Sequence, residues 1–152
     1  MPLHVEIVTQ ERRVFEEPNA DMVIVPASEG TMGVLPHHAP VLTTLGFGEL
    51  IVRKGNAEER FAIYGGVVDV RPGRVIVLAD LAESSYEIDL EAVEAARASA
   101  AEMLQRGVPP EANREATLAL RRAELATRIA RKIQSRGPTI RILDQEPDRR
   151  EE

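Results

Sequence analysis

The sequence of 152 residues contains no cysteine and no tryptophan, and only 3% of its residues are aromatic. Without cysteine the chain has no disulfide, no thiolate metal site and no cysteine nucleophile. So few aromatic rings leave little on which single-stranded nucleic acid could stack. The formal net charge of -6 also opposes the binding of polyanions. The composition therefore excludes a general nucleic-acid-binding protein.

Long apolar runs are absent as well. No stretch approaches the roughly 18 apolar residues of a membrane span, and the first residues hold neither the basic region nor the apolar core of a signal peptide. We therefore expect a cytosolic protein without direct membrane insertion. Hydrophobic residues make up 43% of the chain and charged residues 29%, which is typical of a chain that folds.

The character of the chain changes abruptly at Ile88-Asp89. Before this point short β-branched runs alternate with glycine-containing turns such as Arg71-Pro72-Gly73. The run Leu3-His4-Val5-Glu6-Ile7 has the period of two that is typical of a half-buried strand. Strands that recur about every ten residues with such turns predict a β-sandwich or a flattened barrel for residues 1–86.

Residues 87–136 predict two helices joined by Gly107-Val108-Pro109-Pro110, because glycine ends a helix and proline cannot continue one. Asp89 is a suitable N-cap for the first helix. In the second helix, Leu118, Leu125 and Ile129 fall on one face at about 100° per residue. We expect an antiparallel hairpin whose alanine-rich seam holds only loosely, since a buried alanine contributes far less than a leucine.

Residues 137–152 contain two prolines and end in mixed charge. We interpret them as a mostly flexible C-terminal tail.

No group of residues indicates catalysis, a cofactor or a metal. The neighbours His37 and His38 point opposite ways on an extended chain, and no third ligand stands near them. Gly65-Gly66 lacks the following helix and the lysine of a phosphate-binding loop, so a bulge or a close backbone contact is the better interpretation. We therefore expect a non-catalytic protein.

The second predicted helix carries an excess of positive charge. Residues 111–136 hold seven basic and three acidic side chains, a local charge of +4. Most of these arginines lack a glutamate four residues earlier that would pair with them. A basic stripe offered to an acidic partner explains this better than a solvated face; its members are Arg114, Arg121, Arg122, Arg128, Arg131 and Lys132.

Taken together, these segments resemble the epsilon subunit of F-type ATP synthases. The resemblance covers roughly residues 1–136 and rests on Glu29-Gly30-x-x-Gly33-Val34-Leu35-Pro36-x-His38-Ala39-Pro40, on Phe47-Gly48-Glu49-Leu50, and on the segments 61–70 and 75–83. It implies a ten-stranded β-sandwich followed by a helical hairpin. It also implies a rotor subunit of the central stalk that links the gamma subunit to the ring of c subunits and couples proton flow to ATP synthesis.

The resemblance assigns roles to particular residues. Near the contact with gamma and the c-ring it places Glu29, Gly30, Gly33, His38 and Pro40. The hairpin is implied to extend toward the beta and alpha subunits and to inhibit ATP hydrolysis, with the basic stripe meeting an acidic segment of beta. The implied location is peripheral, on the cytoplasmic face of a bacterial plasma membrane or the stromal face of a thylakoid.

One motif of the family is degenerate here. Some relatives bind ATP on the folded hairpin through Ile/Leu-Asp-x-x-Arg-Ala, whereas this chain has Ile88-Asp89 followed by Ala92-Val93. Arginine is the side chain that would pair with a phosphate through two hydrogen bonds. We therefore expect little or no ATP binding. The alternative from another class is a free-standing β-sandwich adaptor for a peptide or a sugar, with the hairpin as a dimerisation arm.

Overall fold

The computed structural model describes residues 2–85 and 87–132. The predicted tail, residues 137–152, lies outside the described residues. The elements in chain order are β1 (Leu3–Val8), β2 (Arg13–Ala20), β3 (Met22–Ala27), β4 (Gly30–Val34), β5 (Val41–Lys54), β6 (Ala57–Arg71), β7 (Arg74–Ala79), β8 (Ala82–Ser84), α1 (Leu90–Arg106) and α2 (Pro110–Lys132).

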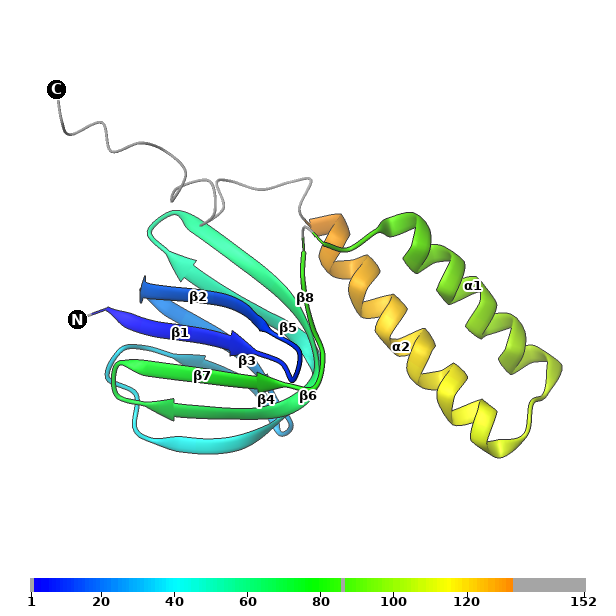
Figure 1. The fold of residues 1–152 in the computed structure, drawn as a ribbon, viewed down its shortest axis with the longest axis horizontal. Helices are drawn as coiled ribbons and strands as arrows, with labels where there is room; N and C mark the ends of the chain where they lie inside the picture. Colours follow the sequence, from blue (N-terminus) through cyan, green and yellow to red (C-terminus); the bar gives the residue numbers. More distant parts are fainter. Residues whose placement is uncertain (1, 86, 133–152) are drawn as a thin grey trace, which may run out of the picture.

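The strands form one sheet that folds over on itself and encloses the main core (Figure 1). Neighbouring strands follow the order β2-β1-β7-β6-β5-β3-β4, and β8 pairs with β6. Alternate residues point inward, as the period of two predicts: Leu3, Val5 and Ile7 of β1 are completely buried. A β-sandwich followed by two helices was the predicted architecture, and that part of the prediction is confirmed.

The predicted number of strands was wrong, because eight are present in the described residues where ten were expected. The reason lies in β5 and β6, which run for 14 and 15 residues and curve around the end of the sheet near the helices (Figure 1). Each passes without a break through glycines, Gly46 and Gly48 in β5 and Gly65 and Gly66 in β6. At Gly66 a Cβ atom would lie 2.2 Å from the carbonyl oxygen of Leu78, and φ is +127°. Only glycine fits this bend.

The two helices lie side by side and antiparallel, and they project away from the sheet (Figure 1). Asp89 caps α1 as predicted: its carboxylate accepts hydrogen bonds from the backbone N–H groups of Glu91 (3.0 Å) and Ala92 (3.3 Å). Gly107 ends α1 with a left-handed backbone, φ +71°. Only the C-terminal part of α2 packs on the sheet, and this decides which apolar residues are buried.

Leu125 and Ile129 are buried by that contact, but Leu118 is not. Its side chain is 40% exposed, as is that of Met103 on α1. Leu118 was expected on the same helical face as Leu125 and Ile129, and the structure buries only the C-terminal part of that face. Leu118 and Met103 lie toward the ends of the helices that extend beyond the sheet, where no third element of the described residues covers them.

Candidate functional site: the contact between the sheet and the second helix

The site begins with an aromatic pair on the outer face of the sheet. Phe47 of β5 and Tyr64 of β6 are direct partners in the ladder. Their rings meet edge to face, with centroids 5.6 Å apart and planes at 85°, a favourable geometry for two aromatic rings. Phe47 lies between Gly46 and Gly48, and Tyr64 is followed by Gly65 and Gly66, where the strands bend. The pair therefore stands at the curved end of the sheet, facing the helices.

The second helix covers this pair with its apolar residues. Ala62, Tyr64, Leu125 and Ile129 form a separate buried cluster, and Phe47 and Ile88 pack against it. Ile129 is completely buried and Leu125 is 5% exposed. Burying one such side chain contributes about 1.5–3 kcal/mol. Because these are the two large side chains that the described part of α2 buries in this cluster, its attachment to the sheet rests on few contacts.

Two arginines complete the contact. The guanidinium carbon of Arg121 lies 5.1 Å from the ring centroid of Phe47, and that of Arg122 lies 5.9 Å from Tyr64 and 6.0 Å from Phe47. The hydroxyl of Tyr64 also donates to the backbone carbonyl of Arg122 at 3.5 Å. A cation over an aromatic ring is stabilised by about 0.5–1 kcal/mol at exposed sites. We call these four residues the arginine–aromatic contact.

The structure thus divides the predicted basic stripe into parts with different surroundings. Arg121 and Arg122 face the sheet, whereas Arg114 is exposed. Arg131 reaches the carboxylate of Glu94 on α1 at 3.6 Å. Arg128 is exposed and lines the same groove between the helices as Arg131. Lys132 ends α2, and its side chain lies outside the described residues.

Beside the arginine–aromatic contact lies a cleft of about 380 Å³ between the sheet and both helices. We call it the interdomain cleft; its titratable lining residues are Tyr64, Glu83, Glu87, Asp89 and Arg122. Three of these are carboxylates and only one is a cation. Ile88 and Ala92 also line it. Ala92 stands at the position of the arginine in the ATP-binding motif, so that position does face the cleft. The charge balance is unfavourable for a phosphate group.

The groups in the interdomain cleft are perturbed by their surroundings. Burial raises the pKa of the Glu83 carboxyl, the nearby Glu87 carboxylate raises it further, and Arg122 opposes the rise. Burial also raises the pKa of the Tyr64 hydroxyl well above its usual range, with a smaller contribution from Glu83. Desolvation disfavours the charged form of both groups. Both groups therefore favour their neutral forms in this cleft.

The five residues predicted to contact gamma and the c-ring do not form one cluster. Glu29 lies in the turn before β4, Gly30 is the first residue of β4 and Gly33 lies within it, whereas His38 and Pro40 lie in the loop after it. A strand of five residues spans roughly 17 Å. The loop after β4 lies beside the β6–β7 turn, because Gly73 N–H donates to the Pro36 carbonyl at 2.6 Å. The structure thus places these residues along β4 and at both of its ends.

Sequence reasoning missed an exposed apolar area on the same sheet, formed by Val8, Leu42, Val67, Ile76 and Leu78. The ladder pairs Val67 with Leu78, and Leu78 with Val8, and all five side chains point away from the main core. Leu42 is 74% exposed and Leu78 is 51% exposed. We call this the outer apolar face. The sequence does carry a signal for this area: the run Val75-Ile76-Val77-Leu78 is apolar at every position. Val75 and Val77 point into the core, so Ile76 and Leu78 point outward.

Comparisons with known proteins give a consistent result. A family model described as ATP synthase, Delta/Epsilon chain, beta-sandwich domain matches residues 2–85. An ATP synthase epsilon chain of Dehalococcoides mccartyi is 44% identical over 131 residues, which cover 86% of this chain and 93% of that one. The epsilon chain of Herpetosiphon aurantiacus is 43% identical over 131 residues, which cover 86% of this chain and 96% of that one.

Solved structures resemble the fold as well. A chain in the Euglena gracilis mitochondrial ATP synthase structure of OSCP, F1 and c-ring superposes with a TM-score of 0.72 at 24% identity, covering 81% of this chain and 78% of that one. At this identity the likeness concerns the fold alone. Among the described residues, no helix is both long enough and apolar enough to cross a membrane.

Proposed function

The chain belongs to the ATP synthase epsilon-chain family of F-type ATP synthases, and from this premise we propose that residues 1–86 dock on the rotor while residues 87–136 act as a movable arm. In this role the protein carries no catalytic residue. It links gamma to the c-ring, and it couples proton flow to ATP synthesis by transmitting rotation. The family match disfavours a free-standing adaptor.

The outer apolar face is the surface that we propose for gamma. An apolar area of this kind on a soluble domain is typical of a protein–protein contact. It extends over the neighbouring strands β5, β6, β7 and β1, with Asp69 of β6 between Leu42 and Ile76. The loop with His38 and Pro40, at the end of β4, is proposed to contact the c-ring. The protein would then be peripheral, at the cytoplasmic face of a bacterial plasma membrane.

Replacing leucine by glutamate tests the gamma surface. Leu42→Glu and Leu78→Glu place a charge where an apolar contact is proposed, so they should abolish co-elution with gamma in size-exclusion chromatography. Leu118→Glu is a matched control, because it changes an exposed leucine on α2. Retention of gamma by the first two variants would contradict this assignment.

The arginine–aromatic contact is the observation that carries the proposal of a movable arm. It holds Arg121 and Arg122 on the sheet through weak interactions, and the same side chains become available to an acidic partner when α2 leaves. States that differ by a few kcal/mol can both be populated. We propose that the released arm meets the beta and alpha subunits and inhibits ATP hydrolysis.

Ending the chain at Ile88 tests the inhibition. The assembled complex should form normally and hydrolyse ATP faster than the complex with the full chain. Arg128→Ala removes a charge of the stripe without touching the arginine–aromatic contact, and should therefore relax inhibition most at low ionic strength, where exposed charges are least screened. Equal ATPase rates for the truncated and full chains would contradict the inhibitory role.

We further propose that the arm does not sense ATP. The interdomain cleft offers one arginine against three carboxylates, and the Asp89 carboxylate is already engaged as the helix cap. Calorimetric titration of the full chain with ATP should therefore detect no binding at micromolar concentrations. Glu83→Gln removes one of the repelling charges, and any residual affinity should rise in that variant.

A further inference from the structure

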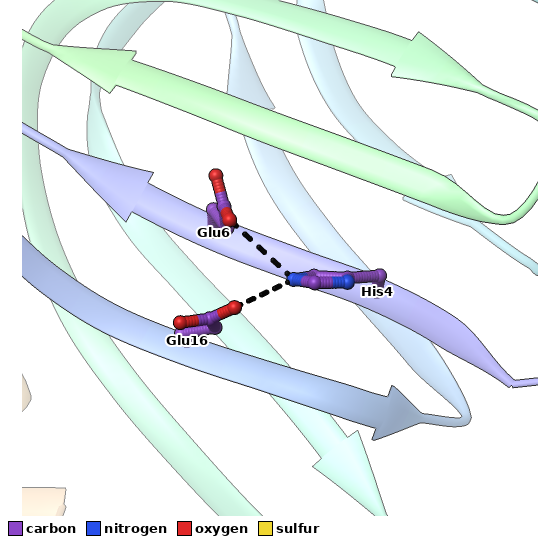
Figure 2. Close-up of side chains that lie close together, drawn as sticks. All are labelled: His4, Glu6 and Glu16. Carbon is purple, nitrogen blue, oxygen red and sulfur yellow. Dashed lines mark hydrogen bonds and ion pairs between the residues drawn. The ribbon is translucent and has the colours of Figure 1, made fainter.

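His4, Glu6 and Glu16 gather on the outer face of the sheet, at the strands farthest from the helices along the sheet order. Figure 2 shows the ring of His4 directed between the two carboxylates, one from β1 and one from β2. One ligand atom from each residue takes part, and these three atoms all lie within 4.8 Å of one another. Histidine with two carboxylates is a set of ligands that binds divalent transition metals.

The register of the sheet produces this cluster. His4 and Glu6 are two residues apart on β1, so they point to the same face, and Glu6 is the direct partner of Glu16 on β2. Two like charges directly opposite on neighbouring strands destabilise a sheet. Arg13 contacts both carboxylates and relieves part of that repulsion, and a metal ion held between them would relieve more of it.

The distances fit a small ion. The Nε2 atom of His4 lies 3.0 Å from Oε1 of Glu16 and 3.5 Å from Oε1 of Glu6. A tetrahedral zinc ion with bonds of about 2.0–2.1 Å holds its ligand atoms roughly 3.3 Å apart. We propose that His4 Nε2, Glu6 Oε1 and Glu16 Oε1 bind a zinc ion, with water in the remaining position.

Two arginines also contact the carboxylates. Arg13 Nη1 lies 2.7 Å from Oε2 of Glu16, the oxygen that faces away from His4. Arg74 Nη2 lies 3.9 Å from Oε2 of Glu6, and Arg13 Nη2 lies 3.9 Å from its Oε1. Groups that hold the outer oxygens of ligating carboxylates are a common support of metal sites. They also offset part of the negative charge, which limits the affinity.

The site requires the ring nitrogen of His4 in its deprotonated form. In the apo state Nε2 and Glu16 share a hydrogen bond, and the metal replaces that proton. Binding joins β1 to β2, and a ligand of the folded state alone raises the apparent stability.

Isothermal titration of the full chain with zinc chloride, at neutral pH in a non-chelating buffer, tests the site. We expect one site per chain, and an affinity at least tenfold lower in each of His4→Gln, Glu6→Gln and Glu16→Gln. His37→Gln is the matched control, because His37 is an exposed histidine in the loop after β4. It should bind zinc like the native chain.

Thermal unfolding provides a second measurement. Zinc should raise the melting temperature of the native chain and of His37→Gln, but not of His4→Gln. Without zinc all three should melt at similar temperatures, because the His4 side chain is 35% exposed and lies outside the core. Absence of saturable binding would overturn the proposal. So would an equal loss of affinity in His4→Gln and His37→Gln, which would indicate adventitious surface binding only.

Discussion

The β domain and the helical pair bury their apolar residues in very different ways. The main core joins 20 buried residues drawn from all eight strands. The contact between the sheet and α2 has four buried members, two of them from the helix, and α1 has one buried residue, Ala100. Because the two regions share few buried contacts, the movement that we propose for the helices would leave the core of the sheet intact.

The largest expected effect is in the main core. Phe61 is completely buried and packs against Phe15, with ring centroids 4.9 Å apart. Phe61→Ala should lower the free energy of unfolding of the β domain by roughly 3–5 kcal/mol. Urea unfolding followed by circular dichroism measures the loss. If the variant unfolds at the same urea concentration as the native chain, Phe61 does not stabilise the main core as expected.

Loss of a buried side chain in α2 should release the arm alone. Ile129→Ala removes a completely buried residue, a change that costs about 2–5 kcal/mol in a core. Amide hydrogen exchange should speed up along α2 and stay unchanged in β1 and β7. Leu118→Ala, at a residue that is 40% exposed on the same helix, should leave both unchanged. Faster exchange throughout the sheet would show that the two regions are coupled.

The arginine–aromatic contact should respond more weakly. Phe47→Leu keeps an apolar side chain but removes the ring beneath Arg121 and Arg122, so the attached state should lose about 1 kcal/mol. A fluorophore pair on α2 and β5 measures the attached fraction. Tyr64→Phe keeps its ring and loses only a 3.5 Å hydrogen bond, and should have a smaller effect. Equal losses in both variants would contradict a role for the cations over the Phe47 ring.

The smallest expected effect is the dependence of arm attachment on pH. Burial and the nearby Glu87 carboxylate raise the pKa of Glu83, which lines the cleft beneath the helices, while Arg122 opposes the rise. Release of the arm is expected to expose Glu83 and so to lower its pKa, in which case the attached state binds a proton more tightly than the released state. Attachment should therefore strengthen as the pH falls, and weaken as the pH rises through the range between the ordinary pKa of glutamate and its raised value. The same fluorophore pair detects this, and Glu83→Gln should remove most of the dependence. An attached fraction that grows as the pH rises would contradict this prediction.

Much of the fold was predictable because local signals agree with it. The period of two in β1, the turn glycines, the Asp89 cap and the Gly107 stop all act over a few neighbouring residues. The number of strands was not predictable, since continuity of β5 and β6 through their glycines depends on how the sheet closes. For the candidate site, the sequence pointed to the arginines of α2 as a uniform stripe, whereas the structure gives them different surroundings; their role stays a proposal.

The sequence by itself determined the two-part architecture, the absence of cysteine chemistry and the excess of basic residues on α2, because composition and short-range periodicity are properties of the chain alone. Only the tertiary structure decided that Arg121 and Arg122 lie over Phe47 and Tyr64, that Leu118 stays exposed, and that His4 meets Glu16. Each of these depends on residues distant in the chain, brought together by strand register and by how far α2 reaches along the sheet.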